Sequence, residues 1–197
     1  MTNLKSMLAA AKPDMDEIER YLDGLSNSAR TEQALSLDRD EQAKLFELAR
    51  GRALDLAYFV PEGTPPMREV VHEGRNSLPA FTRFAKVFVR PDGDEAGSTQ
   101  LWGYNRNPKL IETVVGPGYF VTLPYKVPGE VVIDYRKLPP RKPAHWPPIL
   151  SNKARLSIVV YNGMEDVMRR VSKHVSIGRA TKGGKELDNW FVLCRQE

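Results

Sequence analysis

The sequence predicts an α+β fold, in which an N-terminal helical subdomain packs on a bent antiparallel sheet or partly closed barrel. Three observations support this prediction. Apolar residues recur at helical spacing in residues 1–60, they alternate at strand spacing in residues 68–136, and turns rich in glycine and proline separate the alternating runs. Short strands joined by short connections favour an antiparallel meander over βαβ units. One helix and a final hairpin are expected in the C-terminal region.

The helices of residues 1–60 are predicted from capping residues as well as from apolar spacing. Glu17 follows Asp14 by three residues, and Glu41 follows Asp38, a spacing typical of the capping box at a helix N-terminus. A short helix is expected between these two, at residues 28–35. Because each helix has one apolar face, we expect this helical subdomain to share its core with the sheet.

The strands are predicted from period-two alternation between turn residues. Val, Ile, Tyr and Phe are dense here, and sequences such as Gly-Pro-Gly at residues 116–118 break the runs. The expected strands lie near residues 68–72, 82–90, 100–105, 110–115, 119–124 and 130–135. They belong to a β-rich domain that we place at residues 61–197.

The C-terminal region begins with a connector at residues 138–148 that contains five prolines. We expect this connector to be extended and held to the surface through Trp146. The spacing of Met164, Val167, Met168 and Val171 then predicts a helix, whose last turn would carry positive charge. The final hairpin is predicted over residues 174–195, because Gly-Gly at residues 183–184 supplies the positive φ of a tight turn.

Composition bounds the classes of function. A chain of 197 residues can bury about two-thirds of its unfolded surface. Cys194 is the only cysteine and no run of about 20 apolar residues occurs, so we expect a cytoplasmic protein with no membrane partner. Residues 61–197 carry a net charge of +7. This excess is modest for a nucleic-acid-binding domain, so we expect an ordinary solvated surface and no nucleic-acid partner.

Cofactor motifs do not emerge from the sequence. The Gly-Pro-Gly turn at residues 116–118 precedes a predicted strand, whereas a phosphate-binding loop must lead into a helix. His72-Glu73 resembles the start of a zinc-protease helix, but Asn76 stands where the second histidine would be. The sequence therefore assigns no cofactor, no metal site and no catalytic residue.

Lys86 is the leading candidate for a site. It shares one face of a predicted strand with Phe84 and Phe88, and the opposite face is apolar as well. A lysine buried between aromatic residues needs a partner or a ligand, and Asp134 is the partner we expect. The alternative is a lysine on an edge strand that reaches water.

Further candidate residues come from polar and aromatic positions of neighbouring segments. The full ligand-binding set is Arg75, Asn76, Lys86, Trp102, Tyr104, Asp134 and His174. Arg75 and Asn76 belong to a polar segment, residues 72–77, that is expected to be a loop. His174 lies on a small, polar strand face that is either exposed to solvent or the wall of a pocket.

Three hypotheses for function follow. The first is a small-molecule binding module with its pocket in the concavity of the sheet, whose ligand is an anion that would suit Lys86 and Arg75. The second is an enzyme that uses His72 or His174 as acid and base, with one of these cations polarising the substrate. The third is a basic interaction or nucleic-acid-binding protein that uses the C-terminal helix and the proline-rich connector. The sequence indicates neither the ligand nor the oligomeric state.

Overall fold

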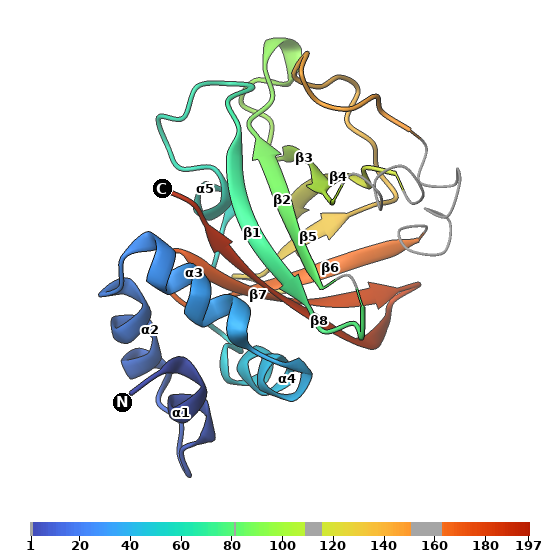
Figure 1. Cartoon of the computed structure of the whole chain (residues 1–197). Coiled ribbons are helices and arrows are strands. Elements are labelled where there is room, and N and C mark those ends of the chain that lie inside the picture. The colour runs from blue at the N-terminus through green and yellow to red at the C-terminus, as the bar shows by residue number, and fades with distance from the viewer. Residues whose placement is uncertain (1, 81, 109–115, 151–162) are drawn as a thin grey trace.

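The computed structural model describes residues 2–80, 82–108, 116–150 and 163–197. Within these residues eight strands form a closed antiparallel barrel, in which each strand pairs with its neighbour in sequence and the last pairs with the first (Figure 1). The strands are β1 (Val70–Asn76), β2 (Arg83–Val89), β3 (Leu101–Arg106), β4 (Tyr119–Pro124), β5 (Val131–Asp134), β6 (Met164–Arg170), β7 (Val175–Lys182) and β8 (Lys185–Arg195). The antiparallel sheet and the α+β class are thus confirmed, and the sheet closes completely. The strand predicted at residues 110–115 falls outside the described residues.

The helices of the N-terminal segment begin where the sequence provides caps. They are α1 (Leu4–Ala9), α2 (Met15–Asp23), α3 (Asn27–Ser36), α4 (Arg39–Leu48) and α5 (Leu56–Phe59), and a short 3-10 turn, η1 (Gly93–Glu95), lies between β2 and β3. The Asp14 carboxylate accepts hydrogen bonds from two backbone amides of α2. Asp38 and Glu41 form the predicted reciprocal capping box of α4.

The helix predicted around residues 164–171 is wrong, because residues 164–170 form β6. The apolar spacing of this segment is compatible with the period of a helix and with that of a strand. As a strand, the segment places Met164 and Met168 in the barrel interior and Val167 outside. Backbone pairing with β5 on one side and β7 on the other stabilises the strand over the helix. Arg169 and Arg170 accordingly do not end a helix, and each forms an ion pair with a glutamate.

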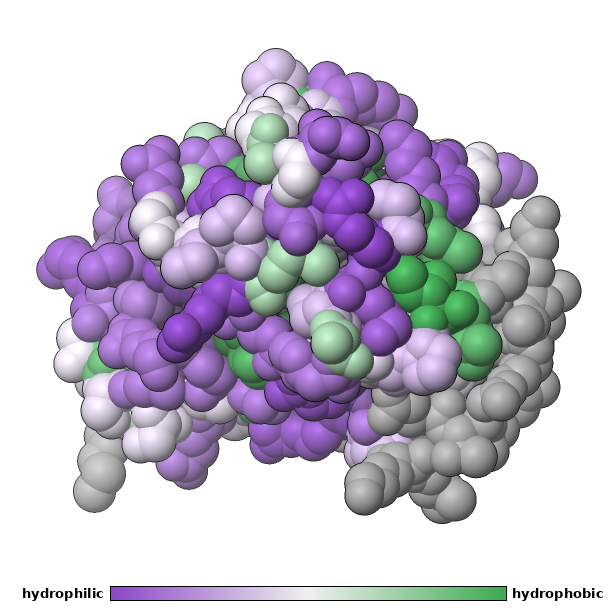
Figure 2. Space-filling view, turned by 90° about the horizontal axis from the view of Figure 1, so that it is seen from above, coloured by the Kyte–Doolittle hydropathy of each residue, from purple (hydrophilic) through white to green (hydrophobic). Residues whose placement is uncertain are grey.

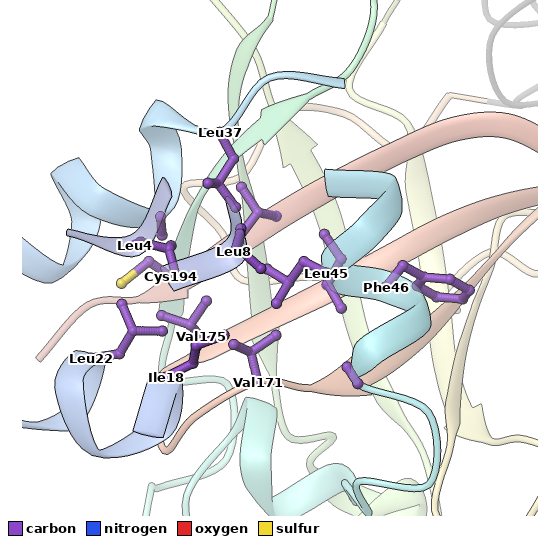
Figure 3. Close-up of a cluster of buried hydrophobic side chains, with 14 of the residues drawn as sticks. Leu4, Leu8, Ile18, Leu22, Leu37, Leu45, Phe46, Val171, Val175 and Cys194 are labelled. Carbon is purple, nitrogen blue, oxygen red and sulfur yellow. The ribbon is translucent and has the colours of Figure 1, made fainter. Parts of the chain in front are cut away.

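Helices α3 and α4 pack on the outer face of β7 and β8, and α1 and α2 pack against these two helices (Figure 1). Apolar residues of the helices meet outward-facing residues of the two strands in one buried cluster (Figure 3). The central residues of this cluster are Leu4, Leu8, Ile18, Leu22, Leu37, Leu45, Val171, Val175 and Cys194. The helical segment and the barrel are therefore joined by a continuous hydrophobic contact.

A second apolar cluster fills one end of the barrel interior. Helix α5 inserts Phe59 there, and its ring lies 4.9 Å from that of Phe88. The ring of Phe88 in turn lies 5.3 Å from that of Phe120. The interior at the α5 end is therefore packed with side chains, and any cavity of the barrel has to lie toward the opposite end.

A third cluster covers the outer face of β3 and β4. Trp146, from the proline-rich connector, is buried against Tyr104 and Tyr119, with ring centroids 4.6 and 6.1 Å away. Its indole N–H donates to Glu69. Trp146 thus anchors the connector, as predicted. Among the described residues, the large hydrophobic residues that are exposed are Leu78, Val127 and Leu138.

The surface seen from above is mostly hydrophilic, with hydrophobic side chains gathered on one side (Figure 2). In the described part of the chain, none of the helices has the length and hydropathy needed to cross a membrane.

Three glycines make room for the phenylalanine rings of the interior. The register pairs Gly74 with Phe84, Gly103 with Phe120 and Gly178 with Phe191 on neighbouring strands. A Cβ atom at each glycine would lie only 2.8, 2.3 or 2.3 Å, respectively, from the ring of its partner. Each ring therefore occupies the space beside a strand position that only glycine leaves free.

Candidate functional site

The candidate site is a cavity of about 370 Å³ at the end of the barrel opposite α5. Its walls are mainly apolar and include Phe84, Met164 and Phe191. Its polar floor consists of Lys86, Asn105, Tyr135 and Asp166, which come from four different segments of the barrel. Polar side chains at the rim include those of Asn76 and Lys182.

The floor is a hydrogen-bonded network centred on the ammonium group of Lys86. Its Nζ donates to Asn105 Oδ1 at 3.0 Å, to Asp166 Oδ2 at 3.1 Å and to the hydroxyl of Tyr135. The amide of Asn105 also donates to the Tyr135 hydroxyl, at 3.0 Å. The three protons of the ammonium group are thus matched by three oxygen acceptors, which partly offsets the loss of water around the charge.

Four aromatic rings surround the same ammonium group. Its Nζ lies 4.8 Å from the ring centroid of Phe191, 5.0 Å from Tyr135, 5.2 Å from Phe120 and 5.6 Å from Phe84. Cations within about 6 Å of a ring centroid are attracted by the ring quadrupole. Three of the four rings, those of Phe84, Phe120 and Phe191, lie next to the glycines described above. The space at these glycines therefore determines how closely the rings approach the Lys86 ammonium group.

Burial changes the acid–base behaviour of Lys86. The side chain is 2% exposed. Loss of hydration lowers the pKa of Lys86, and the Asp166 carboxylate only partly opposes this effect.

The alternation of β2 places Lys86 as the sequence predicts, on the interior face between Phe84 and Phe88. Phe84 lines the cavity, whereas Phe88 packs deeper, against Phe59. Asn76 also lies at the cavity. The segment 72–77 is mostly strand β1 rather than a loop, because its backbone pairs with both β2 and β8.

The prediction that Asp134 is the partner of Lys86 is wrong, because Lys86 forms its ion pair with Asp166. Asp134 lies on the outer face of β5, where the guanidinium of Arg136 donates to it at 2.8 and 2.9 Å. Arg75 likewise points out of the barrel and donates to the carbonyls of Leu35 and Ser36 at the end of α3. Period-two geometry explains both corrections, because neighbours of an inward-facing residue face outward.

The remaining candidate residues lie away from the cavity. Trp102 and Tyr104 belong to the outer cluster beneath Trp146. His174 lies at the α5 end, where its Nε2 is 3.0 Å from Glu197 and its Nδ1 is 3.4 Å from Arg195. Burial, followed by the charges of nearby arginines, lowers the pKa of His174. The structure therefore does not bring these three residues together with Lys86.

Tyr135 and Asp166 were not among the candidate residues, although the sequence holds a signal for each. Tyr135 shares the alternating face of Val131 and Ile133, both of which are interior. Asp166 lies between Met164 and Met168 on one strand face, but this signal is hidden when the segment is interpreted as a helix.

His72 is buried in the barrel at the α5 end and does not line the cavity. Its Nε2 donates to the carbonyl of Phe59 at 3.0 Å, which fixes the neutral tautomer, and its Nδ1 has no hydrogen-bond partner among the described residues. Burial lowers the pKa of His72 to about 3. A neutral, fully enclosed imidazole does not provide the acid–base pair of the enzyme hypothesis.

The buried imidazole of His72 has a consequence for stability in acid. An unfolded histidine binds its proton below a pKa of about 6.5, whereas the folded ring stays neutral until the pH approaches 3. The unfolded state therefore binds more protons between these values, and we expect the contribution of His72 to stability to be lost as the pH falls from about 6.5 towards 3. Nitrogen-15 NMR of the ring should show the neutral Nε2–H tautomer at pH 5. A ring that titrates near 6.5 would contradict this expectation.

The described residues contain no group of three or more His, Cys, Asp or Glu side chains placed to hold a metal ion. Comparison of the chain with known protein families, with curated proteins and with solved structures finds no match. Function therefore has to be inferred from the geometry of the cavity.

Proposed function

We propose that this protein is a binding module that holds one small organic molecule in the barrel. The observation that carries the proposal is the cavity of about 370 Å³ whose apolar walls lead to the polar floor around Lys86. Ligand pockets typically have volumes of about 300–1,000 Å³, with mainly apolar walls and a few placed polar groups. Eight-stranded barrels are just wide enough to hold one small ligand.

The polar floor favours an uncharged ligand over the anion expected from sequence. Asp166 neutralises Lys86 at 3.1 Å, so an anionic ligand would have to compete with a buried carboxylate for the same ammonium group. Arg75, the second expected cation, lies outside the barrel. A molecule with an apolar body and an uncharged polar end fits both the walls and the floor.

The alternative hypotheses receive less support. The C-terminal helix required by the nucleic-acid hypothesis is strand β6, and its arginines are paired: Arg169 lies 2.7 Å from Glu130, and Arg170 contacts Glu19. The enzyme hypothesis required His72 or His174 in the pocket, and both histidines lie at the other end of the barrel.

Binding in the cavity is tested with the uncharged fluorescent dye Nile red. We expect saturable binding of one dye per chain. Ala180→Phe places a ring in the cavity and should weaken binding at least tenfold, because Ala180 is a buried lining residue. Val127→Phe is the matched control, because it adds a ring at an exposed position outside this cavity and should leave affinity unchanged. Equal dye affinity in both folded variants, checked by circular dichroism, would overturn the proposal.

A further inference from the structure

We propose that Lys86 captures its ligand covalently and reversibly, by forming an imine with the carbonyl carbon of an uncharged aldehyde. This inference rests on the proposed binding function and names the class of ligand. The geometry that supports it is a primary amine at the floor of the cavity with a carboxylate oxygen 3.1 Å from its Nζ and a phenol in contact with it.

Packing alone does not explain why a lysine occupies this position. Replacing a buried ion pair with apolar side chains of similar volume is often neutral or stabilising. The neighbours of Lys86 along the interior face of β2 are Phe84 and Phe88, and an apolar residue between them would extend that apolar surface. An ion pair retained at the floor of a cavity is therefore better explained by chemistry than by stability.

The surroundings of Lys86 suit a nucleophilic amine. Attack on a carbonyl needs the neutral form, and desolvation in an apolar pocket is one way in which proteins favour it. Burial lowers the pKa of Lys86, and Asp166 lies where it can receive the proton. The surrounding rings of Phe84, Phe120 and Phe191 keep the amine away from bulk water, which would otherwise favour hydrolysis of an imine.

The reaction balances without any further reactant. Lys86 transfers one proton to Asp166, and the Nζ lone pair forms a bond to the carbonyl carbon while the carbon–oxygen π electrons move to the oxygen. The Asp166 proton and a proton of the attacking nitrogen reach this oxygen, which leaves as water while nitrogen forms the double bond. One aldehyde and one ammonium group thus give one protonated imine and one water, and the carboxylate of Asp166 remains beside the positive charge.

The floor also limits which carbonyl compounds fit. Four ring centroids lie within 5.6 Å of Nζ, so the carbonyl carbon has to approach through a narrow aromatic passage. An aldehyde places only hydrogen on one side of that carbon, whereas a ketone adds a second substituent. An aldehyde with a flat aromatic or linear apolar body fits best.

The test uses cinnamaldehyde, one equivalent per chain, with sodium cyanoborohydride to reduce any imine to a stable secondary amine. Intact-mass and peptide-mapping mass spectrometry then locate the adduct. We expect one adduct per chain, at Lys86, at least tenfold above any other lysine. Lys185→Arg is the matched control, because Lys185 is an exposed amine that does not line the cavity. This variant should be labelled as the wild type is, and folded Lys86→Arg should lose the adduct.

The outcomes separate the two proposals. If cinnamaldehyde displaces Nile red but the adducts are spread over exposed lysines and absent from Lys86, the imine is overturned and the binding function stands. If neither dye nor aldehyde binds in the cavity, both are overturned. Cinnamyl alcohol, which lacks the carbonyl, should compete with Nile red and slow labelling at Lys86 without leaving an adduct. Labelling of Lys86 that is indifferent to this alcohol would place the reaction outside the cavity and contradict the inference.

Discussion

Replacing Asp166 with asparagine is expected to lower the free energy of unfolding by about 3–5 kcal/mol, the usual cost of leaving one member of a buried ion pair without its partner. Asp166 contributes the carboxylate that faces the Lys86 ammonium, and both side chains are almost completely buried. The asparagine keeps the shape of the side chain, removes its charge and replaces one acceptor oxygen with an NH2 donor. Urea unfolding monitored by tryptophan fluorescence measures the loss.

The double variant Lys86→Met with Asp166→Leu provides the control for this prediction. It replaces both charges with apolar groups, so we expect it to recover most of the stability lost by Asp166→Asn. A cost of less than 1 kcal/mol for Asp166→Asn would show that Lys86 gives up its charge easily or is hydrated in solution. That result would contradict the buried pair.

Gly103→Ala is expected to destabilise the barrel by about 1–3 kcal/mol or more, the usual cost of overpacking a core. An added Cβ would lie 2.3 Å from the Phe120 ring and 2.6 Å from the carbonyl oxygen of Val87, and the second of these atoms belongs to the backbone. The ring and the strand cannot both move aside without changing the pairing of β2 with β3. Thermal and urea unfolding measure the effect.

Two further variants make this prediction specific. Phe120→Leu in the Gly103→Ala background should restore part of the loss, because the smaller side chain vacates the space that the Cβ needs. Gly24→Ala should change stability by no more than a few tenths of a kcal/mol, because Gly24 has a helical φ of −78° and lies at the end of α2. Equal costs at positions 24 and 103 would indicate that the Gly–Phe contacts do not constrain the barrel.

Much of the β-rich region could be predicted from local pattern, because alternation fixes which side chains share a face. The face of Phe84, Lys86 and Phe88 follows from period-two geometry alone, and β4 has the predicted bounds of residues 119–124. The capping box of Asp38 and Glu41 could also be predicted from local sequence, because its two residues are only three positions apart. Each of these predictions needs only residues within a few positions of one another.

The partner of Lys86 could not be predicted in the same way, because it depends on pairing between distant segments. Asp166 reaches Lys86 only when the barrel brings β6 and β2 to opposite walls of one interior. Asp134 faces the outside of the barrel because the closed sheet turns its neighbours on β5, Val131 and Ile133, toward the interior. Apolar spacing in residues 164–171 fits two periods, so the choice between helix and strand also required the neighbouring strands.

The seam between β1 and β8 has a consequence for how the chain folds. It joins residues from opposite ends of the barrel sequence, as in the pairing of His72 with Arg195, so it can form only after a very long loop has closed. The other strand pairings join consecutive strands, so this distant pairing is the one that we expect to slow folding most. Until the seam forms, β1 and β8 each present a row of unpaired amides and carbonyls to other chains. The period of greatest risk of association therefore precedes closure, and in the finished barrel these two rows satisfy each other.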